Sequence, residues 1–287
     1  MKRPLFLILI VIVGLAAWFS RGQVRDWYAV ATKPELPEAQ PAVESPASNP
    51  NGDDDAGNTN VTETNSAAEQ EPVDENTPDP AGNIAPVNTN RPAPLPVEVN
   101  LAVPFTSQAP HANWDLPYQE ACEEAAALMV HRFWQNKPLA SKDDADRAIR
   151  EIVDFQEEEY GFYKDTTVEE TARFIRDLWG YDDVEVVTGS AVTADRIKRE
   201  VADGFPVIAL AAGRQLGNPN FTQPGPIYHA LVVKGFTKGG KFITNDPGTR
   251  KGADYLYDPK VLISAIHDWN DGDVANGQKA IVIVRGR

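Results

Sequence analysis

The amino-acid sequence predicts an α+β domain in which helices come first and an antiparallel sheet packs against them. Apolar residues recur at helical spacing through most of residues 120–180. Short runs rich in β-formers, bounded by Gly, Pro, Asn or Asp, dominate the second half of the chain. Because the two kinds of element fall in blocks, they do not fit the regular βαβ alternation of a parallel sheet.

The first 32 residues predict an N-terminal membrane anchor or signal segment. Lys2 and Arg3 precede an uninterrupted apolar run over residues 4–19, close to the roughly 20 residues of a membrane-spanning helix. The small-x-small pattern at residues 14–16 lies inside that run, which favours an uncleaved anchor over a cleaved signal peptide. We therefore expect a single-pass membrane protein with its catalytic domain outside the cytoplasm, or a secreted one if this segment is removed.

Residues 33–98 predict a disordered linker between this segment and a folded domain at residues 99–287. The linker is rich in Pro, Asn and Thr and has no Phe, Trp or Tyr, so it cannot bury enough apolar surface to offset the entropy of ordering. Thirteen Asp and Glu residues and one Arg fall between residues 35 and 98. Most of the acidity therefore belongs to the linker, and the net charge of −15 argues against a nucleic-acid partner.

Capping residues define the helices expected in the domain. Thr167 and Glu170 form a capping box, Ser141 and Thr193 stand at N-cap positions, and Asp258 precedes a proline. We predict helices over residues 120–135, 167–180, 193–204 and 258–269, and a further helix that begins at Ser141. We predict strands over residues 184–187, 207–212, 230–236, 241–245 and 280–284.

Cys122 is the only cysteine of the chain and lies in the expected first turn of the first helix. A lone thiol in an oxidising compartment is either an inert buried residue or one kept for reactivity. The positive end of the helix dipole favours a thiolate, whereas the neighbouring Glu123 and Glu124 oppose it. A reactive Cys122 therefore needs a cationic partner from another element.

Among the four histidines, His229 is the best candidate for that partner. It stands at the start of an apolar strand, and a turn at residues 237–241 returns the chain to Asn245 and Asp246. Either of these residues could orient the imidazole, because the register of the hairpin is loose by a few residues. His131 lies nine residues after Cys122 on the same helix, too far to reach it.

These segments together resemble a known family. The cysteine at a helix start, the sequence HALVVKGF at residues 229–236, TNDPG at residues 244–248 and VPFTSQ at residues 103–108 are similar to the peptidase C39-like group of the papain-like cysteine peptidase superfamily. The resemblance covers most of residues 101–285. It implies a papain-like α+β fold with the nucleophile at a helix N-terminus.

The resemblance also implies roles for particular residues. Cys122 matches the nucleophile and His229 the general base, which would form a thiolate–imidazolium pair. Asp246 matches the orienting acid, and Asn245 remains the alternative.

The resemblance further implies an oxyanion donor before the cysteine. Gln108 matches it, acting with the backbone N–H of Cys122. The insertion over residues 109–118 leaves Gln119 as a second candidate. Glu123 stands where the family commonly has glycine, which is a departure that bears on the thiolate.

The function expected from these observations is a thiol protease of the cell envelope, with a peptide or protein substrate. Two alternatives stay open: cleavage of peptidoglycan cross-bridges or amide transfer on the same scaffold, and a catalytically silent papain-like binding module. No residue cluster has metal-ligand spacing and no glycine-rich phosphate loop follows a strand, so we expect no metal and no cofactor. The long Gly- and Pro-containing loop at residues 213–226 is expected to form a mobile lid.

Overall fold

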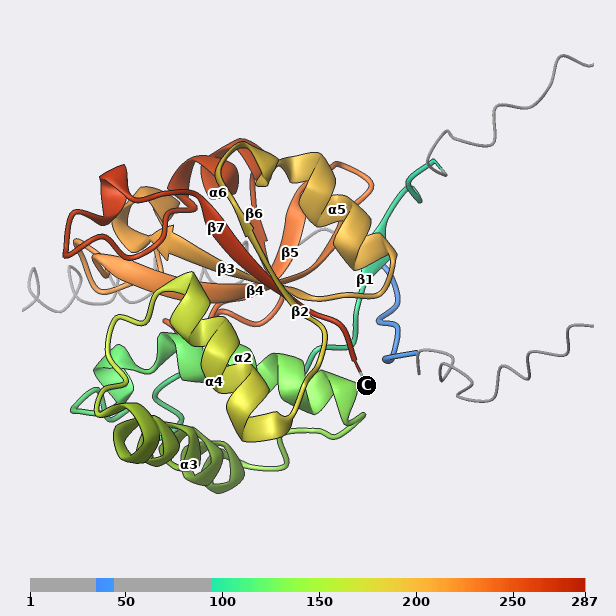
Figure 1. Cartoon of the computed structure of the whole chain (residues 1–287). Helices are drawn as coiled ribbons and strands as arrows, with labels where there is room; N and C mark the ends of the chain where they lie inside the picture. The colour runs from blue at the N-terminus through green and yellow to red at the C-terminus, as the bar shows by residue number, and fades with distance from the viewer. Residues whose placement is uncertain (1–34, 44–93, 287) are drawn as a thin grey trace, which may run out of the picture.

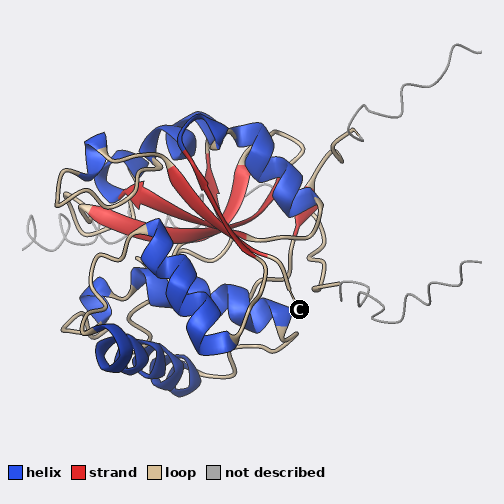
Figure 2. Ribbon diagram, in the orientation of Figure 1, coloured by secondary structure: helices blue, strands red, loops and turns tan. Residues whose placement is uncertain are grey.

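An antiparallel sheet with helices on both faces makes up the part of the chain that the structure describes (Figures 1 and 2). The structure is a computed structural model, and it describes residues 35–43 and 94–286. The predicted anchor at residues 1–32 and most of the predicted linker lie outside these ranges. Within them, no helix has the length and apolar character that a membrane crossing requires.

The sheet has its strands in the order β2-β7-β3-β4-β5-β6, and β1 pairs with β4 off this path. Every pairing is antiparallel. The bounds are β1 Val99–Asn100, β2 Val184–Thr188, β3 Val207–Ala212, β4 Tyr228–Phe236, β5 Phe242–Asn245, β6 Tyr255–Tyr257 and β7 Ala280–Val284. The five predicted strands are confirmed, whereas the short β1 and β6 carry no periodicity that sequence could reveal.

The helices lie in two layers, one on each face of the sheet. Their bounds are α2 Cys122–Trp134, α3 Lys142–Tyr160, α4 Val168–Trp179, α5 Ala194–Ala202 and α6 Pro259–Ala265. Helices α2, α3 and α4 gather on one face, and α5 and α6 cover the other (Figure 1). The predicted α+β class, with N-terminal helices packed on an antiparallel sheet, is therefore confirmed.

Side-chain caps explain where the helices begin. Ser141 accepts from the backbone N–H of Asp144, and Thr167 and Glu170 form the predicted capping box. Gly180 ends α4 with a φ of 66°, a left-handed conformation that glycine adopts without steric cost. These caps could be predicted from the sequence because each depends only on residues within one helical turn.

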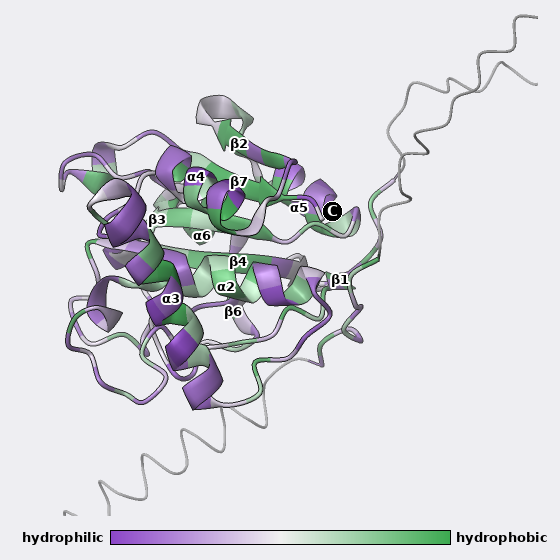
Figure 3. Ribbon diagram, turned by 60° about the horizontal axis from the view of Figure 1, so that its bottom comes forward, coloured by the Kyte–Doolittle hydropathy of each residue, from purple (hydrophilic) through white to green (hydrophobic). Residues whose placement is uncertain are grey.

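The central strands are buried along their whole length. Every residue of β3, β4 and β7 is buried, and these strands are hydrophobic in Figure 3. A strand covered by helices on both faces needs apolar residues at successive positions rather than alternate ones. Strand β4 is therefore a rigid support for the residues at its start, including His229.

The last predicted helix is shorter than expected. It was predicted to reach Trp269, but α6 ends at Ala265. Ile266 forms a bridge with Ala211 of β3, and the backbone N–H of His267 donates to Leu210 O at 3.0 Å. Pairing with the sheet therefore ends the helix early, which local sequence could not indicate.

Residues 35–43, which belong to the predicted linker, lie against the domain. The backbone N–H of Gln40 donates to Asn100 O at 2.8 Å, and that of Ala102 donates to Gln40 O at 2.6 Å. The Asn100 side chain donates to Pro37 O at 2.9 Å. This short segment is therefore joined to the chain just after β1 by backbone hydrogen bonds.

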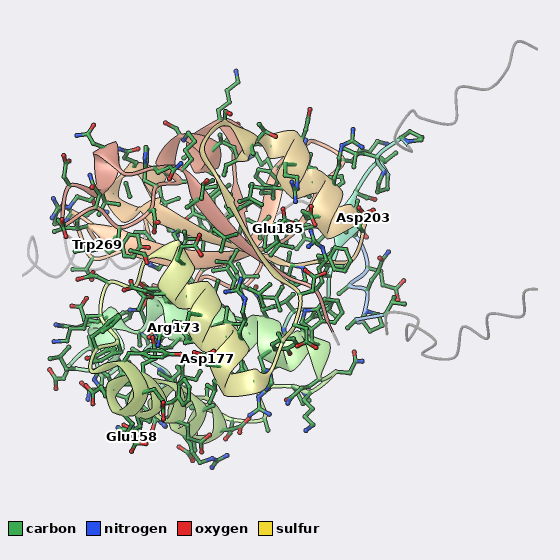
Figure 4. All side chains as sticks on the ribbon, in the orientation of Figure 1. Glu158, Arg173, Asp177, Glu185, Asp203 and Trp269 are labelled. Carbon is green, nitrogen blue, oxygen red and sulfur yellow. The ribbon has the colours of Figure 1, made fainter. Side chains whose placement is uncertain are left out.

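The outer helices α3 and α4 have charged surfaces. Figure 4 labels Glu158 on α3, and Arg173 and Asp177 on α4. Arg173 lies over the ring of Tyr160 and pairs with Asp177 at 3.5 Å. Glu158 is exposed, as are its two neighbouring glutamates, so this acidic run is a solvated helix end.

Candidate active site

Cys122 is the first residue of α2, the helix that packs against β4. A 3₁₀ turn over Tyr118–Glu120 precedes it, and the N-cap residue Ala121 makes no side-chain hydrogen bond. Helix N-termini leave backbone N–H groups without intrahelical partners, so this one can face a developing negative charge. The Ala230 backbone of β4 is a hydrogen-bond partner of the thiol, which places the sulfur beside the strand that carries His229.

His229 is held from several sides at the start of β4, where it is opposite Ala211 in the sheet register. Its Nε2 lies 2.8 Å from Asp246 Oδ1. The ring of Phe221 packs edge-on against the imidazole at a centroid distance of 5.2 Å. A Cβ at Gly248 would lie 2.8 Å from His229 Cε1, so only glycine fits there.

Asp246 directly follows β5 and is fully buried. Its Oδ1 accepts from Gly248 N at 3.0 Å as well as facing His229, and its Oδ2 accepts from Tyr257 Oη at 2.6 Å and Asn218 Nδ2 at 3.0 Å. Burial alone would raise the pKa of this carboxyl, but the charge of His229 and the hydrogen bonds outweigh it and lower the pKa. Asp246 is therefore a buried carboxylate bonded to the imidazole.

Asn245, the alternative orienting residue, has other partners. Its Nδ2 donates to Val103 O at 3.0 Å and Pro104 O at 3.2 Å, and its Oδ1 accepts from the backbone N–H of Asp254. The side chain therefore fastens the segment before Gln108 to the sheet. The structure places Asp246, and not Asn245, on the imidazole.

The two candidate oxyanion donors lie close to Cys122. Gln108 is buried, and its Nε2 donates to Tyr118 O at 2.8 Å and Gln119 O at 3.2 Å. The Gln119 residue is exposed, and both glutamines line the cavity that Cys122 lines. The amide of Gln108 thus holds the turn before Cys122 in place, and the choice of oxyanion donor stays a prediction.

A cavity of about 650 Å³ brings these residues together. Cys122, His229, Gln108 and Gln119 all line it, with the exposed Trp114 and part of the loop at residues 219–226. The sulfur and the imidazole, which are 107 positions apart in the numbering, therefore face one pocket.

The electrostatics of Cys122 differ from the expected low thiol pKa. Burial raises the pKa of the thiol well above its usual value, and the charge of Glu123 and the hydrogen bond to it raise the pKa further. The hydrogen bond with the Ala230 backbone acts in the opposite direction. The thiol lies 2.8 Å from Glu123 Oε2, so the departure from glycine at this position reaches the sulfur directly.

Three residues around the site were not anticipated. Asn218 and Tyr257 both hydrogen-bond Asp246, and Phe221 packs on His229. Asn218 and Phe221 belong to the loop predicted as a mobile lid, yet Asn218 is only 1% exposed. No local pattern marks these residues, because each acts through a contact that only the fold creates.

The other three histidines have separate surroundings. His111 is a surface residue 2.9 Å from Asp143, His131 hydrogen-bonds Tyr181 Oη at 3.0 Å, and His267 Nδ1 lies 2.7 Å from Gly277 O. Of the described residues, no group of three His, Cys, Asp or Glu side chains could hold a metal ion.

Comparison with known proteins agrees with this arrangement. The sequence profile of the peptidase C39-like family matches residues 100–270, a span that contains Gln108, Cys122, His229 and Asp246. The chain belongs to this family. The resemblance inferred from the short motifs is thus confirmed for the C39-like protein, and a search of curated proteins returned no match.

Two solved structures are similar to the C39-like protein. The first is described as a C39-like peptidase from Bacillus anthracis, with 16% identity and a TM-score of 0.42, and the match covers 66% of this chain and 99% of that one. The second is a fragment of prointerpain A from Prevotella intermedia, with 17% identity and a TM-score of 0.35, covering 51% of this chain and 44% of that one.

Proposed function

We propose that this C39-like protein is a cysteine peptidase that cleaves peptide or amide bonds by acyl transfer. Cys122 is the nucleophile, His229 the general base and Asp246 the residue that orients the imidazole. The observation that carries the proposal is the buried bond between His229 and Asp246, in the cavity that Cys122 also lines. This arrangement supports the proposal because a buried carboxylate bonded to Nε2 leaves Nδ1 of the imidazole for the thiol.

The roles follow from which atoms are already engaged. Because Asp246 binds Nε2, the proton of the thiol goes to Nδ1 of His229. The thiolate attacks the carbonyl carbon, and the imidazolium then gives this proton to the leaving amine. The backbone N–H of Cys122 donates to the oxyanion, together with Gln119, or with Gln108 once its amide releases one of its two backbone acceptors. Water hydrolyses the acyl-enzyme and regenerates the thiol.

The proposed location is the outer face of a cell membrane. Residues 1–32 anchor the chain, and Lys2 and Arg3 remain on the cytoplasmic side. The substrate is then a peptide or protein of the cell envelope. The acidic composition supports a protein partner over a nucleic acid.

The test is cleavage of quenched fluorescent peptides and labelled casein by the full chain, between pH 5 and pH 9. Cys122→Ala and His229→Ala are each expected to abolish turnover while the chain stays folded. Turnover that persists in folded Cys122→Ala would contradict the proposal. Digestion of purified peptidoglycan, with the same variant as control, separates cross-bridge cleavage or amide transfer from general peptide hydrolysis.

A second candidate function is a catalytically silent binding module. The observation that favours it is the contact between Cys122 and Glu123, because a carboxylate there disfavours the thiolate. Two results together would favour this module. The wild-type protein would cleave no peptide and no peptidoglycan at any pH in this range, and the immobilised protein would still bind a peptide on a column.

A further inference from the structure

The carboxyl of Glu123 occupies an unusual place beside the nucleophile. The Cys122 thiol donates to Glu123 Oε2 at 2.8 Å, and Glu123 is only 1% exposed. The other oxygen, Oε1, has no hydrogen-bond partner in the described part of the chain. A buried carboxyl that shares one oxygen with a thiol and leaves the other unpaired is costly to ionise.

The groups around Glu123 increase this cost. On α2 it faces Cys122 and Glu124, the segment before α4 brings Asp165, and Tyr228 approaches from β4. Among the described residues, neither a lysine nor an arginine pairs with it. The charges of Glu124 and Asp165 favour the neutral form of the carboxyl, whereas the hydrogen bond from Cys122 favours the ionised form. His229, which lines the same cavity as Cys122, is the one base in this group and takes the thiol proton in the proposed reaction.

We propose that Glu123 is a positioning residue that controls the proton of Cys122: as a neutral acid it donates a hydrogen bond to the thiolate, and as a carboxylate it keeps the thiol protonated. This rests on the proposed function, because the thiolate is the nucleophile of that reaction. Glu123 has no role in the chemistry beyond this bond to sulfur.

The protons balance in each form. With Glu123 neutral, the thiol proton moves to Nδ1 of His229, and Glu123 keeps its own proton and directs it at the sulfur. With Glu123 ionised, the same transfer would place a thiolate and a carboxylate in contact. The thiol then stays protonated and donates to Oε2, which lies 2.8 Å from the sulfur.

The neighbouring carboxyls move this change to higher pH. Burial raises the pKa of Glu124 to about 7, although the Gln156 side chain donates to it at 2.6 Å. Burial raises the pKa of Glu123 well above its usual range, and the charge of Glu124 raises it further. The thiol is therefore expected to be more reactive at mildly acidic than at alkaline pH, the reverse of an ordinary cysteine.

The test is the rate at which iodoacetamide labels Cys122 in the full chain between pH 5 and pH 9. The wild-type rate should fall about tenfold for each pH unit above the ionisation of Glu123. Glu123→Gln keeps the shape, carries no charge and always offers an N–H donor. Its rate should stay level across this range and exceed that of the wild type by about tenfold for each pH unit above the ionisation of Glu123.

Glu124→Gln is the matched control on the same helix turn. It leaves the contact with sulfur intact but removes a charge that raises the pKa of Glu123. The pH at which the labelling rate of Glu124→Gln begins to fall should therefore be lower than in the wild type. A merely structural role for either glutamate would not produce this shift. If Glu123→Gln does not fold, this shift alone decides the question.

The inference would be overturned if the wild-type labelling rate rose with pH as it does for a free thiol and if Glu123→Gln and Glu124→Gln followed the same curve. Peptide cleavage measured alongside separates it from the proposed function. The expected labelling pattern without cleavage of any substrate would overturn the peptidase and leave the control of the thiol by Glu123 standing.

Discussion

Replacing Asp246 with asparagine tests whether the site depends on a buried carboxylate. Asp246 accepts at both oxygens and has four donors in contact. An asparagine of the same shape has one accepting oxygen, which can serve His229 and Gly248. Its amide must then face Tyr257, which can rotate its hydroxyl to accept, and Asn218, which cannot.

The loss of stability can be worked from these contacts. One buried donor left without an acceptor costs about 1–3 kcal/mol, and two retained bonds that lose their charge weaken by about 1 kcal/mol each. We expect the free energy of unfolding to fall by roughly 3–5 kcal/mol at pH 7, a large part of the 5–15 kcal/mol typical of a domain. Peptide cleavage should fall as well, because the imidazolium loses its counter-charge.

The assay is urea unfolding at a series of pH values. The pKa of Asp246 is lowered in the folded protein, so its stabilisation is present above the unfolded pKa of about 3.9 and is lost as the pH falls through the folded pKa. The gap between wild type and Asp246→Asn should therefore close in acid. Asp177→Asn, which alters an exposed ion pair with Arg173, is the matched control with little expected change. Equal stability of wild type and Asp246→Asn at pH 7 would refute the reasoning.

Two further substitutions probe the same network. Gly248→Ala puts a methyl group 2.8 Å from the imidazole of His229, and should lower kcat/KM by at least about tenfold in folded protein. Gly239→Ala, whose Cβ would meet nothing closer than 3.7 Å, should leave kcat/KM unchanged. Equal kcat/KM for the two variants would contradict the inference that a side chain at position 248 displaces His229. Tyr257→Phe removes a bond that lowers the pKa of Asp246, so stability at pH 7 should fall by about 1.5–3 kcal/mol. In thermal melts at a series of pH values, the Tyr257→Phe variant should begin to lose stability at a higher pH than the wild type as acid is added. The same onset pH for both proteins would count against this role of Tyr257.

The elements that sequence predicted are those specified by neighbouring residues. The capping box at Thr167 and the cap at Ser141 need only residues one turn away, and the long apolar runs of β3 and β4 match buried strands. The end of α6 was missed because Ile266 leaves the helix to pair with Ala211. The local preference of residues 266–269 for helix competes with pairing to a strand that is distant in sequence. Only the folded structure shows that the pairing is preferred.

The candidate site divides in the same way. Cys122 and His229 could be selected because each stands at a recognisable place, a helix start and a strand start. The preference for Asp246 over Asn245 required the register of the hairpin, which a bulge between Val233 and Gly235 shifts. The contact of Glu123 with sulfur could not be foreseen, since a glutamate in a first helical turn ordinarily points to solvent.

The docking of residues 35–43 changes how far the catalytic cavity can lie from a membrane. Gln40 is bonded to the domain beside β1, so a tether from the predicted anchor reaches the domain at residue 40. With an anchor ending at residue 32, only residues 33–40 separate lipid from protein, about 30 Å at full extension. As long as this segment stays bonded to the domain, the substrates within reach of the cavity would then be those at the bilayer surface.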